Sequence, residues 1–181
     1  MTVHDFAASL ADSHTQGNDE VFWEAVYRSV FPTYQGMVYL RDNGLAQRSG
    51  VDRHVSLANG RVIRIEEKVR FKNYDDFCLE YWSVFKGDGN AQNAAGWIAK
   101  DLACDFIAYA FMPSRQVYFL PWPQLRLAWR EHRTSWDKRF RKVVAANNGY
   151  DTISVAVPIA VVLAAMSDVT LVQLPVEQDA Q

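Results

Sequence analysis

The chain has 181 residues, of which 49% are hydrophobic and 13% aromatic, a composition typical of a globular protein with a sizeable core. A formal net charge of −2 excludes a strongly basic protein that attracts polyanions through its overall field, so any nucleic-acid surface must be a local patch. The start of the chain lacks a basic or long apolar segment, and Cys78 and Cys104 have no metal-binding spacing. We therefore expect a soluble, cytoplasmic protein with reduced thiols, no membrane partner and one domain over residues 1–181.

The first well-marked element is a helix, predicted from about Asn18 to the residue before Pro32. Residues 1–17 have weak periodicity and are expected to be a loose arm or a short helix. Asn18 is a typical N-cap, and acidic residues follow it in the first turn. Glu20 and Glu24 lie one turn apart and share a face. They are either ordinary solvated acids of a helix start or contributors to a site.

Residues 47–57 and 61–71 predict two strands joined at Asn59-Gly60, a strong short-range signal for a β-hairpin. Because the arms of a hairpin run antiparallel, Asp52 on the first arm returns to the level of the segment Glu66-Glu67-Lys68 on the second. The hairpin therefore gathers three acids and one lysine near one strand end.

The alternation of side chains along a strand puts Glu66 and Lys68 on one face and Glu67 on the other. Burying charge is costly unless the charges are paired or bind a metal ion. Asp52 and Glu66 offer the oxygen ligands that Mg²⁺ prefers, and Lys68 could orient a water or stabilise a phosphorane-like transition state. The alternative is that the charged residues form only structural ion pairs on the strand surface.

Asp52 followed by Glu66-Glu67-Lys68 on the next strand resembles the active-site signature of the PD-(D/E)xK nuclease superfamily, which includes type II restriction enzymes, archaeal-type Holliday-junction resolvases and many phage nucleases. The resemblance covers roughly residues 20–120. Val51 stands where the signature has proline, and the downstream Gln-x-x-x-Tyr motif of exonuclease members is absent. Residues 96–111 also resemble small phage or prophage members. The resemblance implies an α/β fold of the restriction-endonuclease-like type, with a central mixed β-sheet flanked by helices.

The same resemblance implies Mg²⁺-dependent hydrolysis of DNA phosphodiester bonds, with Mn²⁺ able to substitute. Asp52 and Glu66 would hold the metal, the backbone carbonyl of Glu67 would be a further ligand, and Lys68 would act on the water or the transition state. In many such nucleases a helix before the sheet adds an acid, here Glu24, with Glu20 in reserve. The alternative function is a catalytically silent protein of this fold that binds a nucleic acid or a protein partner in a regulatory role. RNA as substrate and a homodimer stay open.

Residues 77–83 predict a third strand in which Glu80 has apolar neighbours on both sides. In a mostly buried sheet such an acid either reaches solvent at a strand end or joins the site. Glu80 is therefore another candidate metal ligand, with Ser83 beside it. Residues 105–112 and 116–122 predict a second hairpin.

A long helix is predicted over residues 123–142, in which Trp122, Trp129 and Trp136 recur every seven residues. This stripe is more typical of a core than of a base-stacking platform. The candidates for contacts with nucleic-acid phosphates are basic residues on this helix and elsewhere: Arg70, Lys72, Lys100, Arg126, Arg130 and Arg133. The alternative is a solvated charged face. A strand over 152–157, a buried apolar helix over 158–166, a strand over 168–174 and a polar tail over 175–181 complete the prediction.

Overall fold

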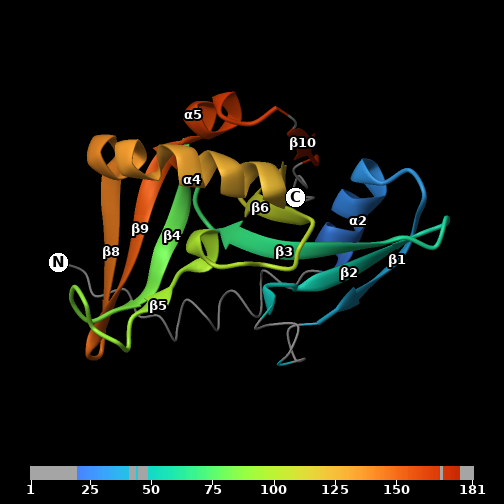
Figure 1. The fold of residues 1–181 in the computed structure, drawn as a ribbon. Coiled ribbons are helices and arrows are strands. Elements are labelled where there is room, and N and C mark those ends of the chain that lie inside the picture. Colours follow the sequence, from blue (N-terminus) through green and yellow to red (C-terminus); the bar gives the residue numbers. More distant parts are fainter. Residues whose placement is uncertain (1–19, 41–43, 45–48, 168, 176–181) are drawn as a thin grey trace, which may run out of the picture. The chain divides into compact units, whose positions relative to one another are not determined.

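The computed structural model describes residues 20–40, 44, 49–167 and 169–175 (Figure 1). Within these residues the chain forms two compact units. The mixed-sheet unit contains residues 20–74, 103–122 and 169–175, and the antiparallel unit contains residues 75–102 and 123–167. The expectation of one domain over the whole chain stays a prediction.

The mixed-sheet unit is built on a six-stranded sheet in the described residues, in the order β1-β2-β3-β6-β7-β10. Neighbouring strands are antiparallel except for β3 and β6, which are parallel. The strands are β1 (Tyr34–Tyr39), β2 (Arg53–Leu57), β3 (Val62–Arg70), β6 (Phe106–Phe111), β7 (Gln116–Pro121) and β10 (Thr170–Gln173). The predicted α/β class with a central mixed sheet and accompanying helices is confirmed.

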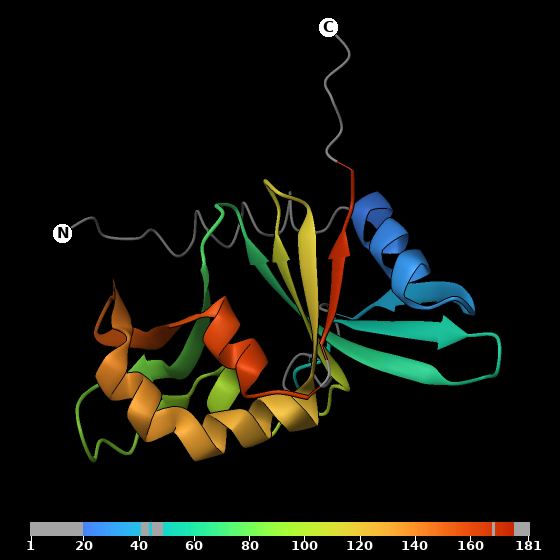
Figure 2. The same cartoon turned by 90° about the horizontal axis from the view of Figure 1, so that it is seen from above.

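Helix α2 (Glu20–Val30) packs on one face of this sheet, beside β1 and β10 (Figure 2). Its apolar side buries Phe22, Trp23, Val26 and Tyr27, which recur at the three- and four-residue spacing of an amphipathic helix. These side chains join the inward-facing residues of the sheet in one core: Val55, Ile63, Ile65, Ala108, Ala110, Val117, Phe119 and Val172. The α2 face of β3 therefore carries the odd-numbered residues of that strand.

The predicted hairpin of β2 and β3 is confirmed, with Arg53 opposite Ile65 and Ser56 opposite Val62. Gly60 has a φ of 80°, a left-handed conformation that suits glycine, and the Asn59 side-chain oxygen accepts a 3.1 Å hydrogen bond from the Arg61 amide. The turn residues thus set the register that brings Asp52 beside Glu66 and Glu67. These acids lie in the middle of β3, not at a strand end as expected, because the strand continues to Arg70.

The antiparallel unit is built on a sheet in the order β5-β4-β9-β8. Its strands are β4 (Asp76–Phe85), β5 (Ala94–Ala95), β8 (Arg141–Asn147) and β9 (Tyr150–Pro158), and its helical elements are η1 (Trp97–Ala99), α4 (Trp122–Arg139) and α5 (Ile159–Ala164). Within it, Trp129 packs 6.3 Å from Trp136 and 5.9 Å from Tyr81, measured between ring centroids, in agreement with the core interpretation of the tryptophan stripe. In the described part of the chain, no helix combines the length and apolar character needed to cross a membrane.

Two boundaries differ from the prediction. The long helix ends at Arg139 rather than at about residue 142, and residues 141–147 pair with β9 instead. The run Val143-Val144 is β-branched and favours a strand, which the basic residues before it obscured. The apolar segment near residue 160 forms only a six-residue helix in which Val162 is buried, not the fully buried helix expected. The expected arm over residues 1–17 and the tail beyond residue 175 lie outside the described residues.

Candidate active site

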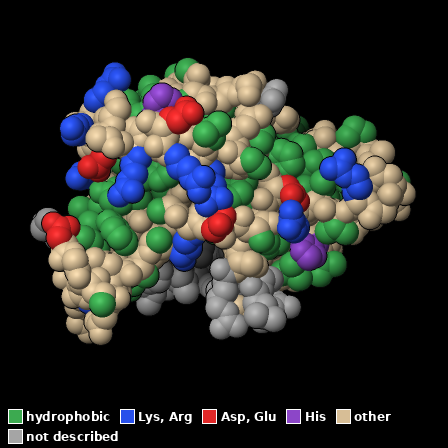
Figure 3. All heavy atoms as spheres, viewed as in Figure 1, with side chains coloured by type: hydrophobic (Ala, Val, Ile, Leu, Met, Phe, Trp, Pro, Cys, Tyr) green, Lys and Arg blue, Asp and Glu red, His purple; other side chains and the backbone are tan. Residues whose placement is uncertain are grey.

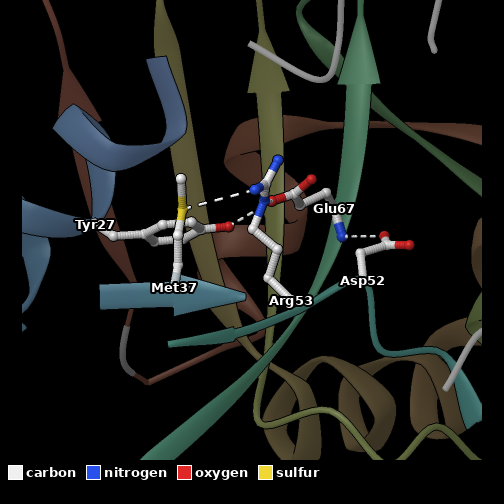
Figure 4. A network of polar contacts seen from close by, with 5 residues as sticks. All are labelled: Tyr27, Met37, Asp52, Arg53 and Glu67. Atoms are coloured by element: carbon white, nitrogen blue, oxygen red, sulfur yellow. Dashed lines mark hydrogen bonds and ion pairs between the residues drawn. The ribbon is translucent and has the colours of Figure 1, made fainter. Parts of the chain in front are cut away.

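Asp52 lies immediately before β2 and is held against β3 by backbone and side-chain hydrogen bonds (Figure 4). Its amide donates a 2.8 Å hydrogen bond to the Ile65 carbonyl, and its Oδ2 accepts a 2.8 Å hydrogen bond from the Glu67 amide. The Leu40 amide donates to the Asp52 carbonyl at 2.8 Å. The Asp52 carboxylate is thus buried, with 6% of the residue exposed, and fixed at the middle of the Glu66-Glu67-Lys68 segment.

Glu66 and Lys68 share the face of β3 opposite the α2 core, as the alternation of the strand predicts. In the parallel register they stand beside Ile107 and Tyr109 of β6. The Lys68 ammonium forms an ion pair with the Glu66 carboxylate, and both side chains are only partly exposed. A buried carboxylate, that of Glu66, and the partly exposed ammonium of Lys68 therefore lie next to the fixed Asp52.

Cys104 adjoins the Glu66–Lys68 pair from the chain just before β6. Burial raises the pKa of the Cys104 thiol to about 12, and the negative charge of Glu66 adds to the rise. The thiol is therefore protonated at neutral pH, which makes it a poor nucleophile.

Asp105 is a charged residue whose role the sequence did not indicate. Its carboxylate accepts hydrogen bonds from the Arg64 amide at 2.8 Å, from Nε at 3.2 Å and from Nη2 at 2.8 Å. Although burial raises the pKa of Asp105, the hydrogen bonds and charge of Arg64 lower it overall. This two-pronged pair joins β3 to the start of β6 and fixes the parallel register beside Glu66.

Glu67, on the other face of β3, belongs to a buried network rather than to the Glu66–Lys68 pair (Figure 4). Its Oε1 accepts a 2.5 Å hydrogen bond from Arg53 Nε and a 2.6 Å hydrogen bond from the Tyr27 hydroxyl. The Arg53 guanidinium also lies 3.6 Å from the Met37 sulfur. The network therefore ties α2, β1, β2 and β3 together directly behind Asp52.

Burial raises the pKa of Glu67 to about 7, although the positive charge of Arg53 opposes the shift. Burial also raises the pKa of Tyr27 well above its ordinary value. Glu67 Oε2 has no hydrogen-bond partner within the part of the chain that the structure describes. From the sequence, only the backbone carbonyl of Glu67 was expected to take part in the site. The position of Glu67 among the inward-facing apolar residues of β3 was the signal that its side chain forms a buried ion pair.

Two of the candidate acids have other hydrogen-bond or ion-pair partners among the described residues. Glu24 lies on α2, where its carboxylate pairs with Arg28 at 2.6 Å, and with Glu20 it lines a hollow of about 270 Å³ that Arg53 also lines. This is the side of Glu67, whereas Glu66 faces away from α2. Glu80 belongs to the antiparallel unit, where it accepts a 2.6 Å hydrogen bond from the Ser83 hydroxyl.

The basic candidates fall into two groups. Arg70 ends β3 and its guanidinium lies 4.5 Å from the ring centroid of Tyr74, while Lys72 is exposed just beyond it. The others are in the antiparallel unit: Lys100, Arg126, Arg130 and Arg133. Only the first group belongs to the unit that carries Asp52 and Glu66.

The acids of this group offer oxygen donors to a metal ion. Among the described residues, no group of three or more His, Cys, Asp and Glu side chains is arranged to hold a metal. Mg²⁺, however, is usually bound through one or two protein carboxylates, with waters and substrate phosphate filling the other positions. The two buried carboxylates, Asp52 and Glu66, fit that requirement in number and kind and do not fit a closed four-ligand zinc site.

Comparison with known proteins adds little to this geometry. No family model matches the chain, and no curated protein matches it. One solved structure that resembles it is a bacterial homing endonuclease, I-Ssp6803I, with 14% sequence identity and a TM-score of 0.37 over 60% of this chain and 69% of that one. A resemblance of this degree assigns neither family nor activity, so the function has to be argued from the site.

Proposed function

We propose that this chain is a metal-dependent nuclease that hydrolyses DNA phosphodiester bonds with a PD-(D/E)xK-type site on a restriction-endonuclease-like sheet. The observation that carries the proposal is the hydrogen bond from the Glu67 amide to Asp52 Oδ2. Through it, residues separated by a whole hairpin in the sequence form one group: a fixed aspartate, a glutamate one residue along the facing strand, and a lysine paired with that glutamate.

Asp52 and Glu66 would hold one divalent ion, Mg²⁺ or Mn²⁺. When bound, such an ion lowers the pKa of a coordinated water and neutralises charge on the phosphate. Asp52 needs no rearrangement for this role because the Glu67 amide already fixes its carboxylate. A preorganised carboxylate costs less to bring into the reacting arrangement than a mobile one.

Lys68 would exchange its contact with Glu66 for one with the attacking water or a phosphate oxygen. Its ammonium is held beside the carboxylate and remains partly exposed, which suits a group that has to meet substrate. A cation placed where negative charge develops stabilises the transition state more than the ground state. Arg70, which ends the same strand, and Lys72, just beyond it, would contact flanking phosphates.

Cleavage of supercoiled plasmid and of branched DNA in Mg²⁺ or Mn²⁺ tests the proposal. We expect nicking by the wild type, and a rate at least about a hundredfold lower for Lys68→Ala and Asp52→Asn, since each removes a group that acts on the transition state. The exposed residues Lys86 and Asp88 provide matched controls, and Lys86→Ala and Asp88→Asn should cleave at the wild-type rate.

Unchanged cleavage in both site variants would refute the assignment of the residues. The absence of cleavage on every DNA, together with the absence of Mn²⁺ binding, would refute the nuclease and favour the regulatory, partner-binding alternative.

A further inference from the structure

The antiparallel unit enters the chain as two insertions into the mixed-sheet unit. Residues 75–102 lie between β3 and β6, and residues 123–167 lie between β7 and β10. The two insertions form one sheet, because β4 of the first pairs along its length with β9 of the second. The residues proposed for chemistry, Asp52, Glu66 and Lys68, all belong to the other unit. The inserted unit therefore has surface that the proposed reaction does not use.

A hollow of about 250 Å³ lies within the antiparallel unit, against helix α4. Its lining consists of Ile98, Ala99, Arg126, Trp129, Arg130 and Arg133. Ile98 and Trp129 are buried and form an apolar wall, while the three arginines recur at helical spacing on one side of α4. Basic side chains gather along this helix on the face seen in Figure 3.

The charges of this hollow are only partly neutralised. Arg126 Nη1 pairs at 2.5 Å with Asp101, a side chain that is 80% exposed. Arg130 and Arg133 are exposed, and no acid in the described ranges lies within ion-pair distance of either. Three guanidinium groups against one carboxylate leave the hollow cationic. Guanidinium groups bind phosphate oxygens with two parallel hydrogen bonds, so the favoured ligand is a phosphate-bearing one.

The dimensions favour a nucleic-acid strand over a single phosphate. Arg126 to Arg133 span seven residues, roughly 10 Å of helix at 1.5 Å per residue. One strand of DNA presents about three phosphates over that axial length.

We propose that the inserted antiparallel unit binds the phosphodiester backbone of DNA through Arg126, Arg130 and Arg133. The choice of DNA rests on the proposed function; the binding site itself does not use the residues proposed for chemistry. The contacts are to backbone and therefore independent of base sequence.

Binding of a fluorescently labelled duplex to the full chain in EDTA, measured by anisotropy over a range of salt concentrations, tests this. We compare the wild type with the double variant Arg130→Gln/Arg133→Gln. The matched control is Lys138→Gln/Arg139→Gln, which removes the same charge from the same helix outside the hollow. The hollow variant should bind about tenfold or more weakly, and the slope of log K against log salt should fall by about 2.

The control should keep a salt slope close to that of the wild type. Equal slopes in the wild type and the hollow variant would overturn the proposal, as would equal losses in the hollow variant and the control. Displacement of the duplex by inorganic phosphate at the same phosphate concentration would also overturn it, because the site would then not recognise a strand. Arg130→Lys/Arg133→Lys, which keeps the charge, should retain most of the salt slope but lose affinity, and it serves if the glutamine variant does not fold.

The result can be told apart from failure of the nuclease, because EDTA suppresses metal-dependent cleavage. If the protein cuts no DNA but its DNA binding requires Arg130 and Arg133, this inference is supported and the proposed reaction is refuted. If the protein cleaves plasmid DNA but its DNA affinity is unchanged by substitution of Arg130 and Arg133, the proposed reaction is supported and this inference is refuted.

Discussion

Asp52 Oδ2 accepts its 2.8 Å hydrogen bond from the backbone amide of Glu67, not from a side chain. The contact therefore depends on the path of β3 and survives any change in the side chain at position 67. It places the Asp52 carboxylate one residue from Glu66 along the same strand. The side chain of Glu67 then stabilises the strand from the opposite face, through Arg53 and Tyr27.

Asp52→Asn and Asp52→Ala should differ in stability. Asparagine keeps a side-chain oxygen that can accept from the Glu67 amide, so its free energy of unfolding should fall by less than about 1 kcal/mol. Alanine leaves that buried amide without its acceptor, which costs about 1–3 kcal/mol. Urea unfolding of both variants measures the difference. Equal stabilities would show that the hydrogen bond does not hold the strand.

Removing one member of the Arg53–Glu67 pair should lower the free energy of unfolding more than replacing both members with apolar side chains. Both side chains are about 1% exposed, so Glu67→Leu alone leaves a buried guanidinium without its partner and should cost about 3–5 kcal/mol. Arg53→Met/Glu67→Leu removes both charges and should cost clearly less than Glu67→Leu alone. A double-mutant cycle by chemical unfolding checks this, and additive losses would contradict it.

Tyr27→Phe removes the hydroxyl that donates to Glu67 at 2.6 Å while keeping the ring in the core. Above pH 7, where Glu67 is ionised, a hydrogen bond to this charged group contributes about 1.5–3 kcal/mol, so the variant should lose about that much stability there. Tyr34→Phe is the matched control on the same side of the unit, because Tyr34 is only partly buried, and should lose less. Thermal and urea unfolding give the comparison; a larger loss in the control would refute the ranking.

Stability should fall as pH rises from about 4.5 to about 7. Burial raises the pKa of Glu67 from 4.5 to about 7, so in this window the folded chain binds a proton that the unfolded chain has released. The stabilisation is complete below the lower value and is lost on passing the upper one, by up to about 3 kcal/mol. Asp105, whose pKa is lowered, changes stability only at more acidic pH.

Urea unfolding from pH 5 to 8 measures the slope of the free energy of unfolding against pH. This slope should flatten in Glu67→Gln, and an unchanged slope in that variant would show that another group causes the pH dependence.

The hairpin and the faces of β3 could be predicted because they depend on local chemistry. Asn59-Gly60 sets the turn, and the period of two sets which side chains share a face. The pattern does not say what lies against each face. Glu67 could be placed inward from the sequence, but its partner Arg53 and the contribution of Tyr27 required the packing of α2 on the sheet.

The two-unit organisation could not be predicted because its pairings are long-range. Strand β4 pairs with β9, although β5, β6, β7, α4 and β8 lie between them in the chain. Glu80 and Glu24 became candidates from their sequence neighbours alone. Glu80 has apolar residues on both sides, and Glu24 lies on the helix that precedes the sheet. The fold puts Glu80 in the other unit and Glu24 on the α2 side. Charge pattern identified Arg126, Arg130 and Arg133, but only the structure gives them a common hollow.

The central claim is that Asp52 and Glu66 together hold a divalent ion, and Mn²⁺ binding followed by electron paramagnetic resonance tests it most directly. The account predicts saturable binding by the wild type and by Lys68→Ala, and at least about tenfold weaker binding by Asp52→Asn and by Glu66→Gln. No Mn²⁺ binding by the wild type, or the same affinity in the wild type and Asp52→Asn, would contradict it.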